Sequence, residues 1–132
     1  MRYWQIKTLL HGISILVCFT LLLGCGGGGP ARKSLKGKVT YAGEPVPMGR
    51  IMFEPDISQG NDGPQGFSSI ENGFYNTNNF GKGAITGPLI VTITAFEKSE
   101  KGLPAKPLFP RYVTRVNLSE DAASLDFAIP GS

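Results

Sequence analysis

Residues 89–96 read LIVTITAF, and this stretch decides the class of fold. Val91 and Ile93 alternate with Thr92 and Thr94, which is the two-residue period of a β-strand and not the 3.6-residue period of a helix. The threonine face of the stretch also carries apolar side chains. We therefore expect a central strand with both faces at least partly covered.

Other short apolar runs with the same period lie on both sides of this stretch. They predict strands at residues 35–41, 50–54, 67–70, 74–77, 112–118 and 124–129. Asn72 and Gly73 separate two of these runs and predict a hairpin, because both residues accept a positive φ. The inward-facing residues of the predicted strands are Val39, Ile51, Phe53, Val91, Ile93, Leu125 and Phe127.

The composition agrees with a β domain. The chain has 132 residues, of which 18 are glycine and 10 are proline, and only 17% are charged, which disfavours a coiled coil or a helical bundle. No helical period occurs after residue 25, and we expect the polar segment 76–83 to be a loop without a partner. Six to seven short strands in residues 35–130 predict an all-β fold, a single antiparallel β-sandwich.

The order of strand and turn residues also resembles a known group of proteins. The matching patterns are LxGxVxYxGxPV at 35–46, GxIxFxP at 49–55, GxY at 73–75, VxI at 91–93, PxY at 110–112 and LxFxI at 125–129. They resemble small bacterial lipoproteins whose domain is a carboxypeptidase regulatory-like, transthyretin-like (prealbumin-like) sandwich. The resemblance implies a Greek-key-type β-sandwich and says almost nothing about activity. Residues 87–90, GPLI, depart from the Gly-Lys-Tyr that is usual there.

The N-terminal 24 residues read as an export signal. Arg2 and Lys7 precede the apolar run 13–23, which has the length of a signal-peptide core and is shorter than a membrane-spanning helix. Residues 22–25, LLGC, resemble the lipobox of bacterial lipoproteins, which implies cleavage before Cys25 and attachment of diacylglycerol and palmitate-type acyl chains to it. The alternative is an uncleaved anchor with an incidental cysteine.

We therefore predict three parts of the chain: a signal peptide at residues 1–24, a lipidated, glycine-rich tether at 25–34 and a β domain at 35–130. It places the protein in the bacterial cell envelope, exported and held to a membrane through Cys25. Gly26 is not the aspartate that resembles an inner-membrane retention signal, so we favour the outer membrane over the inner one.

The residue inventory disfavours several kinds of function. His11 and Cys18 precede the predicted cleavage site, so the mature chain has no imidazole, and its one thiol is the lipidated Cys25. Of the 13 basic residues, Arg2 and Lys7 are removed with the signal, which leaves a nearly neutral chain against 10 acidic residues. We therefore expect no nucleic-acid partner, no cofactor, no metal and no catalysis.

Residues 54–62 contain the only cluster of carboxylates in the sequence that we consider as a catalytic or metal-binding site. Glu54, Asp56 and Asp62 lie close together in the sequence, and pairs of carboxylates can act as general acid and general base. The pattern Asp56-x-Ser58-x-Gly60 also loosely resembles a calcium-binding loop, but its closing glutamate is missing. We expect these carboxylates to be solvated and their pKa values to be unperturbed. A small carboxylate- or metal-dependent envelope hydrolase using this loop is the alternative function.

Aromatic residues give the only sign of an interaction surface. Phe109, Tyr112, Phe80 and Tyr75 lie on or beside predicted loops and could form a recognition patch. A core or corner position for Tyr112, with its hydroxyl bonded to backbone, is the alternative. We expect a non-catalytic, lipid-anchored module for adhesion, scaffolding or ligand binding, whose partner beside the membrane is an envelope protein or a glycan.

Overall fold

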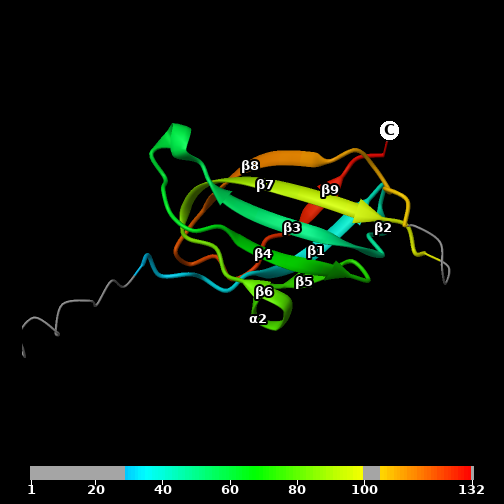
Figure 1. Ribbon diagram of the computed structural model, residues 1–132, viewed down its shortest axis with the longest axis horizontal. Coiled ribbons are helices and arrows are strands. Elements are labelled where there is room, and N and C mark those ends of the chain that lie inside the picture. Colours follow the sequence, from blue (N-terminus) through cyan, green and yellow to red (C-terminus); the bar gives the residue numbers. More distant parts are fainter. Residues whose placement is uncertain (1–28, 100–104, 132) are drawn as a thin grey trace, which may run out of the picture.

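The computed structural model describes residues 29–99 and 105–131. In this part of the chain one sheet has the strand order β2-β1-β5-β4-β3-β7-β8, with β6 paired to β4 and β9 paired to β1 (Figure 1). The strands are β1 (Lys36–Tyr41), β2 (Glu44–Pro45), β3 (Met48–Pro55), β4 (Gly66–Glu71), β5 (Phe74–Asn76), β6 (Gly81–Lys82), β7 (Gly87–Phe96), β8 (Tyr112–Leu118) and β9 (Phe127–Ile129).

Strand β7 occupies the central position that its sequence predicted. It pairs antiparallel with β3 on one side, with Ile51 opposite Ile93, and antiparallel with β8 on the other, with Thr114 opposite Val91. Its odd-numbered residues from Leu89 to Ala95 are buried, whereas Ile90, Thr92 and Thr94 are half-buried. The alternation of the sequence therefore corresponds to the two faces of the sheet.

The predicted hairpin is confirmed between β4 and β5. Asn72 has φ of 50° and Gly73 has φ of 81°, which is the left-handed pair that a two-residue hairpin turn requires. Ile70 then pairs with Tyr75, so both side chains enter the core. The turn residues thereby set which side chains of the two strands face inward.

Strand β1 lies beside the β2 edge of the sheet order and also pairs with β9. It pairs antiparallel with β5 and β2 and parallel with β9, where Val39 lies opposite Phe127. Gly37 is required at the point where the backbone of Leu125 crosses, because a Cβ on residue 37 would overlap the Leu125 carbonyl oxygen. The parallel contact brings the end of the chain against its first strand.

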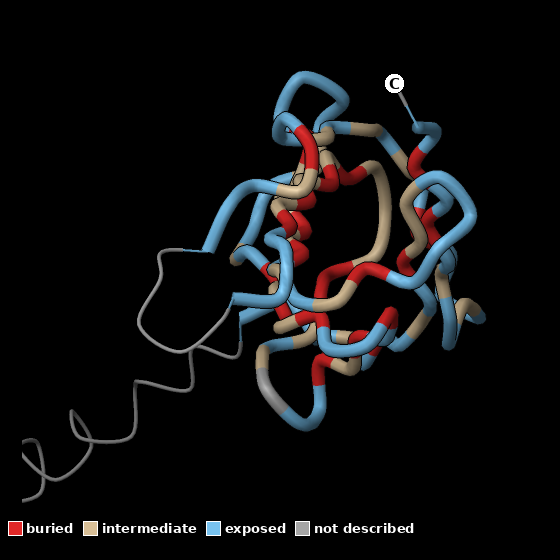
Figure 2. Tube along the Cα trace, turned by 90° about the vertical axis from the view of Figure 1, so that its right-hand side faces the viewer, coloured by how far each residue is buried: buried red, intermediate tan, exposed pale blue. Residues whose placement is uncertain are grey.

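The sheet curls strongly, so that the fold is an all-β, antiparallel half-barrel. Buried residues line the inside of the curl and exposed residues lie outside it (Figure 2). Six of the seven predicted core residues are buried, namely Val39, Ile51, Phe53, Val91, Ile93 and Phe127. Leu125 is only partly buried and packs at the margin of the core, because it precedes β9.

The prediction that residues 76–83 form a loop without a partner is wrong. Residues Thr77–Phe80 form a single helical turn, α2, and β6 pairs with Phe67 and Ser68 of β4. The helical turn forms because the Asn76 side chain accepts from the backbone N–H of Asn78. Thr77 fixes this turn to the domain, since its Oγ1 accepts from the N–H of Leu35 at 2.9 Å.

The described residues also form the 3-10 turn η2 (Ile57–Gln59), within the loop between β3 and β4. Neither this turn nor any other helix of the described residues is long and apolar enough to cross a membrane. The predicted signal peptide, Cys25 and the first glycines of the predicted tether lie outside the described residues. Arg32 is bonded to the domain, because its guanidinium donates to the carbonyls of Gln65 and Gly83.

Candidate functional site

The structure does not bring the three carboxylates of residues 54–62 together in one site. Glu54 lies on β3 and accepts a hydrogen bond from Nε2 of Gln65 at 2.8 Å. Asp62 is exposed, whereas Asp56 is only 1% exposed. The expectation of a uniformly solvated acidic loop is therefore wrong for Asp56, which the turn of the chain into η2 points inward.

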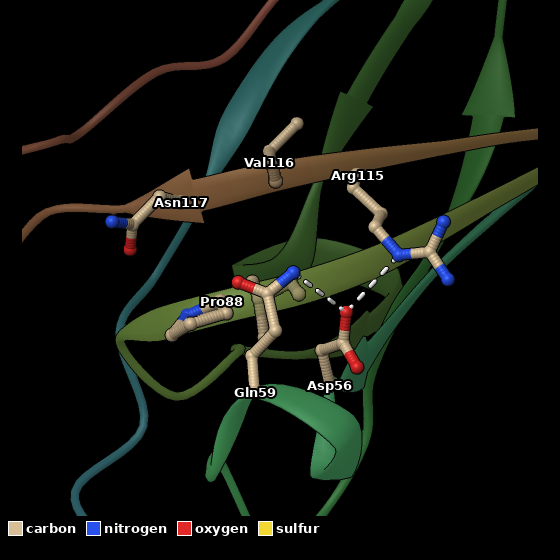
Figure 3. A pocket seen from close by; sticks show the side chains of 7 residues that line it. Asp56, Gln59, Pro88, Arg115, Val116 and Asn117 are labelled. Carbon is tan, nitrogen blue, oxygen red and sulfur yellow. Dashed lines mark hydrogen bonds and ion pairs between the residues drawn. The ribbon is translucent and has the colours of Figure 1, made fainter.

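The carboxylate of Asp56 is surrounded by donors. Its Oδ1 accepts from the backbone N–H of Ser58 at 3.1 Å and from the Ser58 hydroxyl. Its Oδ2 accepts from Nε2 of Gln59 at 3.3 Å and from Nε of Arg115, on β8, at 3.1 Å (Figure 3). Asp56 is thus the N-cap of η2 and also an ion-pair partner of the edge strand.

These contacts keep Asp56 ionised. The hydrogen bond from the Ser58 hydroxyl lowers the pKa of Asp56 most, burial raises it, and Arg115 lowers it further. The result is a pKa below the ordinary value for aspartate, in contrast to the unperturbed pKa that the sequence predicted. A general acid at neutral pH needs a raised pKa, so the shift runs against that role.

A shallow pocket of about 210 Å³ lies beside this pair. Its lining comes from the η2 loop, the start of β7 and the end of β8: Asp56, Gln59, Pro88, Leu89, Arg115, Val116 and Asn117. The Arg115 side chain is 67% exposed, and its two terminal nitrogens turn away from Asp56 (Figure 3). Among the described residues, no three His, Cys, Asp or Glu side chains gather as a possible metal site.

A second hollow, which we call the aromatic groove, contains no charged residue. It has a volume of about 300 Å³ and is lined by Tyr41, Phe109, Pro110, Tyr112, Ile129, Pro130 and Gly131. The rings of Tyr41 and Phe109 pack with their centroids 4.9 Å apart. The groove lies where the end of β1 and the end of β9 approach the start of β8. Aromatic and apolar walls of this kind are typical of binding sites.

The structure divides the four aromatic residues that the sequence singled out. Phe109 and Tyr112 line the aromatic groove, together with Tyr41, the last residue of the predicted strand 35–41. Tyr75 lies in the core, and its hydroxyl donates to the Leu125 carbonyl at 2.8 Å. A hydrogen bond from a tyrosine hydroxyl to the backbone is the alternative expected for Tyr112, and Tyr75 makes such a bond. Phe80 ends α2.

The aromatic groove and the start of the described chain lie at opposite ends of the domain. We call the end where β7 begins the near end, because the described part of the chain also begins there and Lys33 pairs with Ala84. The η2 turn lies at the same end (Figure 1). We call the end with Phe96 and the aromatic groove the far end. Strand β7 runs from the near end to the far end.

Comparison with known proteins adds no relative to this description. Neither protein-family models, nor curated proteins, nor solved structures match the chain.

Proposed function

We propose that the chain is a non-catalytic, lipid-anchored module of the bacterial cell envelope that binds another envelope component through the aromatic groove. The observation that carries this proposal is the groove itself, an uncharged hollow of aromatic and proline side chains at the far end of a rigid sheet. A site at that end would face away from a membrane anchor attached at the near end. Tyrosine and phenylalanine bury large areas in recognition sites at a low cost in side-chain entropy.

The lining of the groove favours one class of ligand. It offers rings, prolines and an isoleucine but no charge, so a charged ligand would lose its hydration without gaining a counter-ion. Extended, proline-rich peptide segments dock into aromatic-lined grooves of this kind. The ligand that we propose is such a segment of another envelope protein, and a neutral glycan is the other outcome of the test.

The anchor in this proposal is Cys25, acylated after removal of residues 1–24. Its support is the LLGC quartet after the apolar run, and we favour the outer membrane because Gly26 follows the cysteine. Mass spectrometry of the membrane-extracted protein should show a diacylglyceryl group on Cys25. A Cys25→Ser chain that is still cleaved and lipidated would overturn the anchor.

The finer fold that we propose is the transthyretin-like β-sandwich. Its support is that the residues of the resemblance fall on matching elements: Leu35, Val39 and Ile51 are buried on or beside β1 and β3. In that arrangement β1, β2 and β9 face β3, β7 and β8 across the core. An experimental structure with all of these strands in one unclosed layer would contradict it.

The absence of catalysis is supported by the state of the carboxylates. Asp56 is ionised and fully engaged, and Glu54 is bonded to Gln65. The rival hydrolase would use these same residues. The rival activity can be tested with a Glu54→Gln, Asp62→Asn double variant, which leaves the Asp56 ion pair intact. Hydrolysis of an ester, glycan or peptide that the double variant abolishes would establish the rival function.

The binding role can be tested by thermal shift on the detergent-solubilised lipoprotein. Proline-rich peptides, neutral oligosaccharides and calcium are added separately, and a ligand at 100 times its Kd should stabilise the protein by about 2.7 kcal/mol. Tyr112→Ala should abolish the shift given by the peptides. Val113→Ala is the matched control, because Val113 is the next residue of β8 but faces outward. Equal shifts in both variants would exclude the aromatic groove.

A further inference from the structure

Ile57 is the most exposed of the large apolar side chains in residues 29–99 and 105–131. It is 74% exposed, compared with 57% for Phe74 and 50% for Val113. A single exposed apolar residue is normal on a soluble protein and requires no explanation by itself. Ile57 differs in how it is held and in where it lies.

The turn that carries Ile57 is fixed on several sides. Gly60, in the left-handed conformation, closes the turn with its N–H on the Ile57 carbonyl at 3.0 Å. Asp56 caps the start of the turn and is tied to Arg115. The Asn61 side chain donates to the Pro88 carbonyl at 2.7 Å and to the Thr86 carbonyl at 3.1 Å. The exposed side chain therefore projects from a rigid support.

The η2 turn lies at the near end, where the chain joins the domain. Arg32 is bonded to Gln65 and Gly83, so the connection between Cys25 and the fixed part of the domain is seven residues long. Seven residues span at most about 25 Å even when fully extended. The ten residues of β7 are about 33 Å long, so the connection is shorter than the domain. An acylated Cys25 would thus hold the near end close to the lipid surface.

From these observations we infer that Ile57 inserts into the bilayer when the domain is anchored, and that it orients the domain with the aromatic groove facing away. This inference rests on the proposed acylation of Cys25. Apolar side chains at such a contact enter the boundary between headgroups and acyl chains, roughly 5–10 Å deep. The η2 turn is then a second, reversible contact beside a permanent one.

The charged residues at the near end do not favour anionic over zwitterionic lipid headgroups. Besides the Arg115–Asp56 pair and Glu54, which is bonded to Gln65, they include Arg32, Lys33, Lys82, Asp62, Glu120 and Asp121. Charges of both signs thus lie together, which weakens electrostatic attraction to anionic headgroups. The contact should therefore be apolar and should form on zwitterionic and on anionic membranes alike.

The experiment uses the acylated full-length protein in vesicles of phosphatidylcholine. A polarity-sensitive fluorophore is placed on Ile57→Cys, and the matched control carries it on Phe74→Cys, an exposed residue away from the near end. Lipids with a nitroxide near the headgroup serve as quenchers. Quenching should be several-fold stronger at position 57 than at position 74, and the emission at position 57 should shift to the blue on reconstitution.

Three outcomes can be distinguished. Equal quenching at both positions, in protein whose Cys25 is acylated by mass, would overturn the inference and leave the anchor standing. A second fluorophore on Cys25 would show a free thiol there and would overturn the anchor itself. Quenching at position 57 that appears only after phosphatidylglycerol is added would also overturn the inference, because the contact would then be electrostatic.

An unlabelled variant gives an independent measurement. Ile57→Ser should leave the thermal midpoint in detergent unchanged, because the side chain contributes little to the fold when it is exposed. In phosphatidylcholine vesicles the same variant should expose residues of η2 to faster amide hydrogen exchange than the parent protein. Identical exchange in vesicles would contradict insertion.

Discussion

Asp56 and Arg115 lie 59 positions apart in the chain, and Nε of Arg115 donates to Oδ2 of Asp56 at 3.1 Å. The pair joins the η2 loop to β8, the last strand in the sheet order. Because the carboxylate is buried and the guanidinium is largely exposed, the contact stabilises the loop without forming an enclosed charge site. An acidic residue that looked like a candidate for chemistry is thus a structural residue of the near end.

Arg115→Gln should lower the thermal midpoint at neutral pH and should have little effect in strong acid. The pKa of Asp56 is depressed in the folded protein, so the stability from its charge is fully present above the ordinary value of 3.8 and is lost as pH falls through the lower folded value. Thermal unfolding of variant and parent at several pH values measures this difference. Arg111→Gln is the control, and a difference between Arg115→Gln and the parent that grows towards acid would contradict the assignment.

Tyr75→Phe should cost roughly 1 kcal/mol at neutral pH, because the Leu125 carbonyl loses its hydroxyl donor. Burial, aided by the negative charge of Asp126, raises the pKa of Tyr75 far above its ordinary value of 10.0. Its contribution to stability is therefore present below pH 10 and is lost as pH rises further. Urea unfolding should show the parent losing stability faster than Tyr75→Phe above that pH. Parallel pH profiles would mean that the phenol is accessible.

Phe127→Ala should lower the free energy of unfolding by roughly 3 to 5 kcal/mol, the usual range for a buried aromatic residue. The Phe127 ring lies in the core with its centroid 6.4 Å from that of Tyr75. Lys38→Ala should cost under about 0.5 kcal/mol, since Lys38 is exposed on β1. Chemical denaturation of the two variants tests whether β9 and β1 pair in this register, and similar costs would refute it.

Gly37→Ala should destabilise the domain far more than Gly60→Ala. A methyl group on residue 37 would overlap the Leu125 carbonyl, so β9 would have to move away from β1. A methyl group on Gly60 meets no atom, and its cost is that of the left-handed conformation, about 1–2 kcal/mol. Thermal midpoints rank the two variants. The reverse order would show that the β1–β9 contact is not tight.

Much of the fold could be predicted from local sequence. Val91 and Ile93 alternate with threonine, and Asn72 precedes Gly73, so the strand period and the hairpin are set by neighbouring residues. Segment 76–83 could not be placed in this way, because Thr77 is held by Leu35 and β6 by β4. Those partners are distant in sequence and leave no local pattern.

The candidate sites were less predictable than the strands. Phe109 and Tyr112 were recognised as aromatic residues beside loops, but Tyr41 joins them only because β1 and β8 approach each other at the far end. Asp56 and Asp62 lie in one polar loop, so the sequence predicts that both are solvated. Its partners Ser58 and Gln59 are neighbours of Asp56 in the sequence, but its charged partner, Arg115, lies on β8, and nothing near Asp56 in the sequence indicates it.

The sequence by itself determined which residues extend, where the chain turns and which side chains face inward, because these properties depend on dihedral preferences and on a two-residue period. The tertiary structure decided which strands are neighbours, and with them the contact of Asp56 with Arg115 and the aromatic groove. The Asp56–Arg115 contact and the shape of the aromatic groove both depend on segments that are distant in the sequence but adjacent in the fold. The sequence shows only that residue 57 is an isoleucine. The fold places this side chain on a fixed turn at the near end.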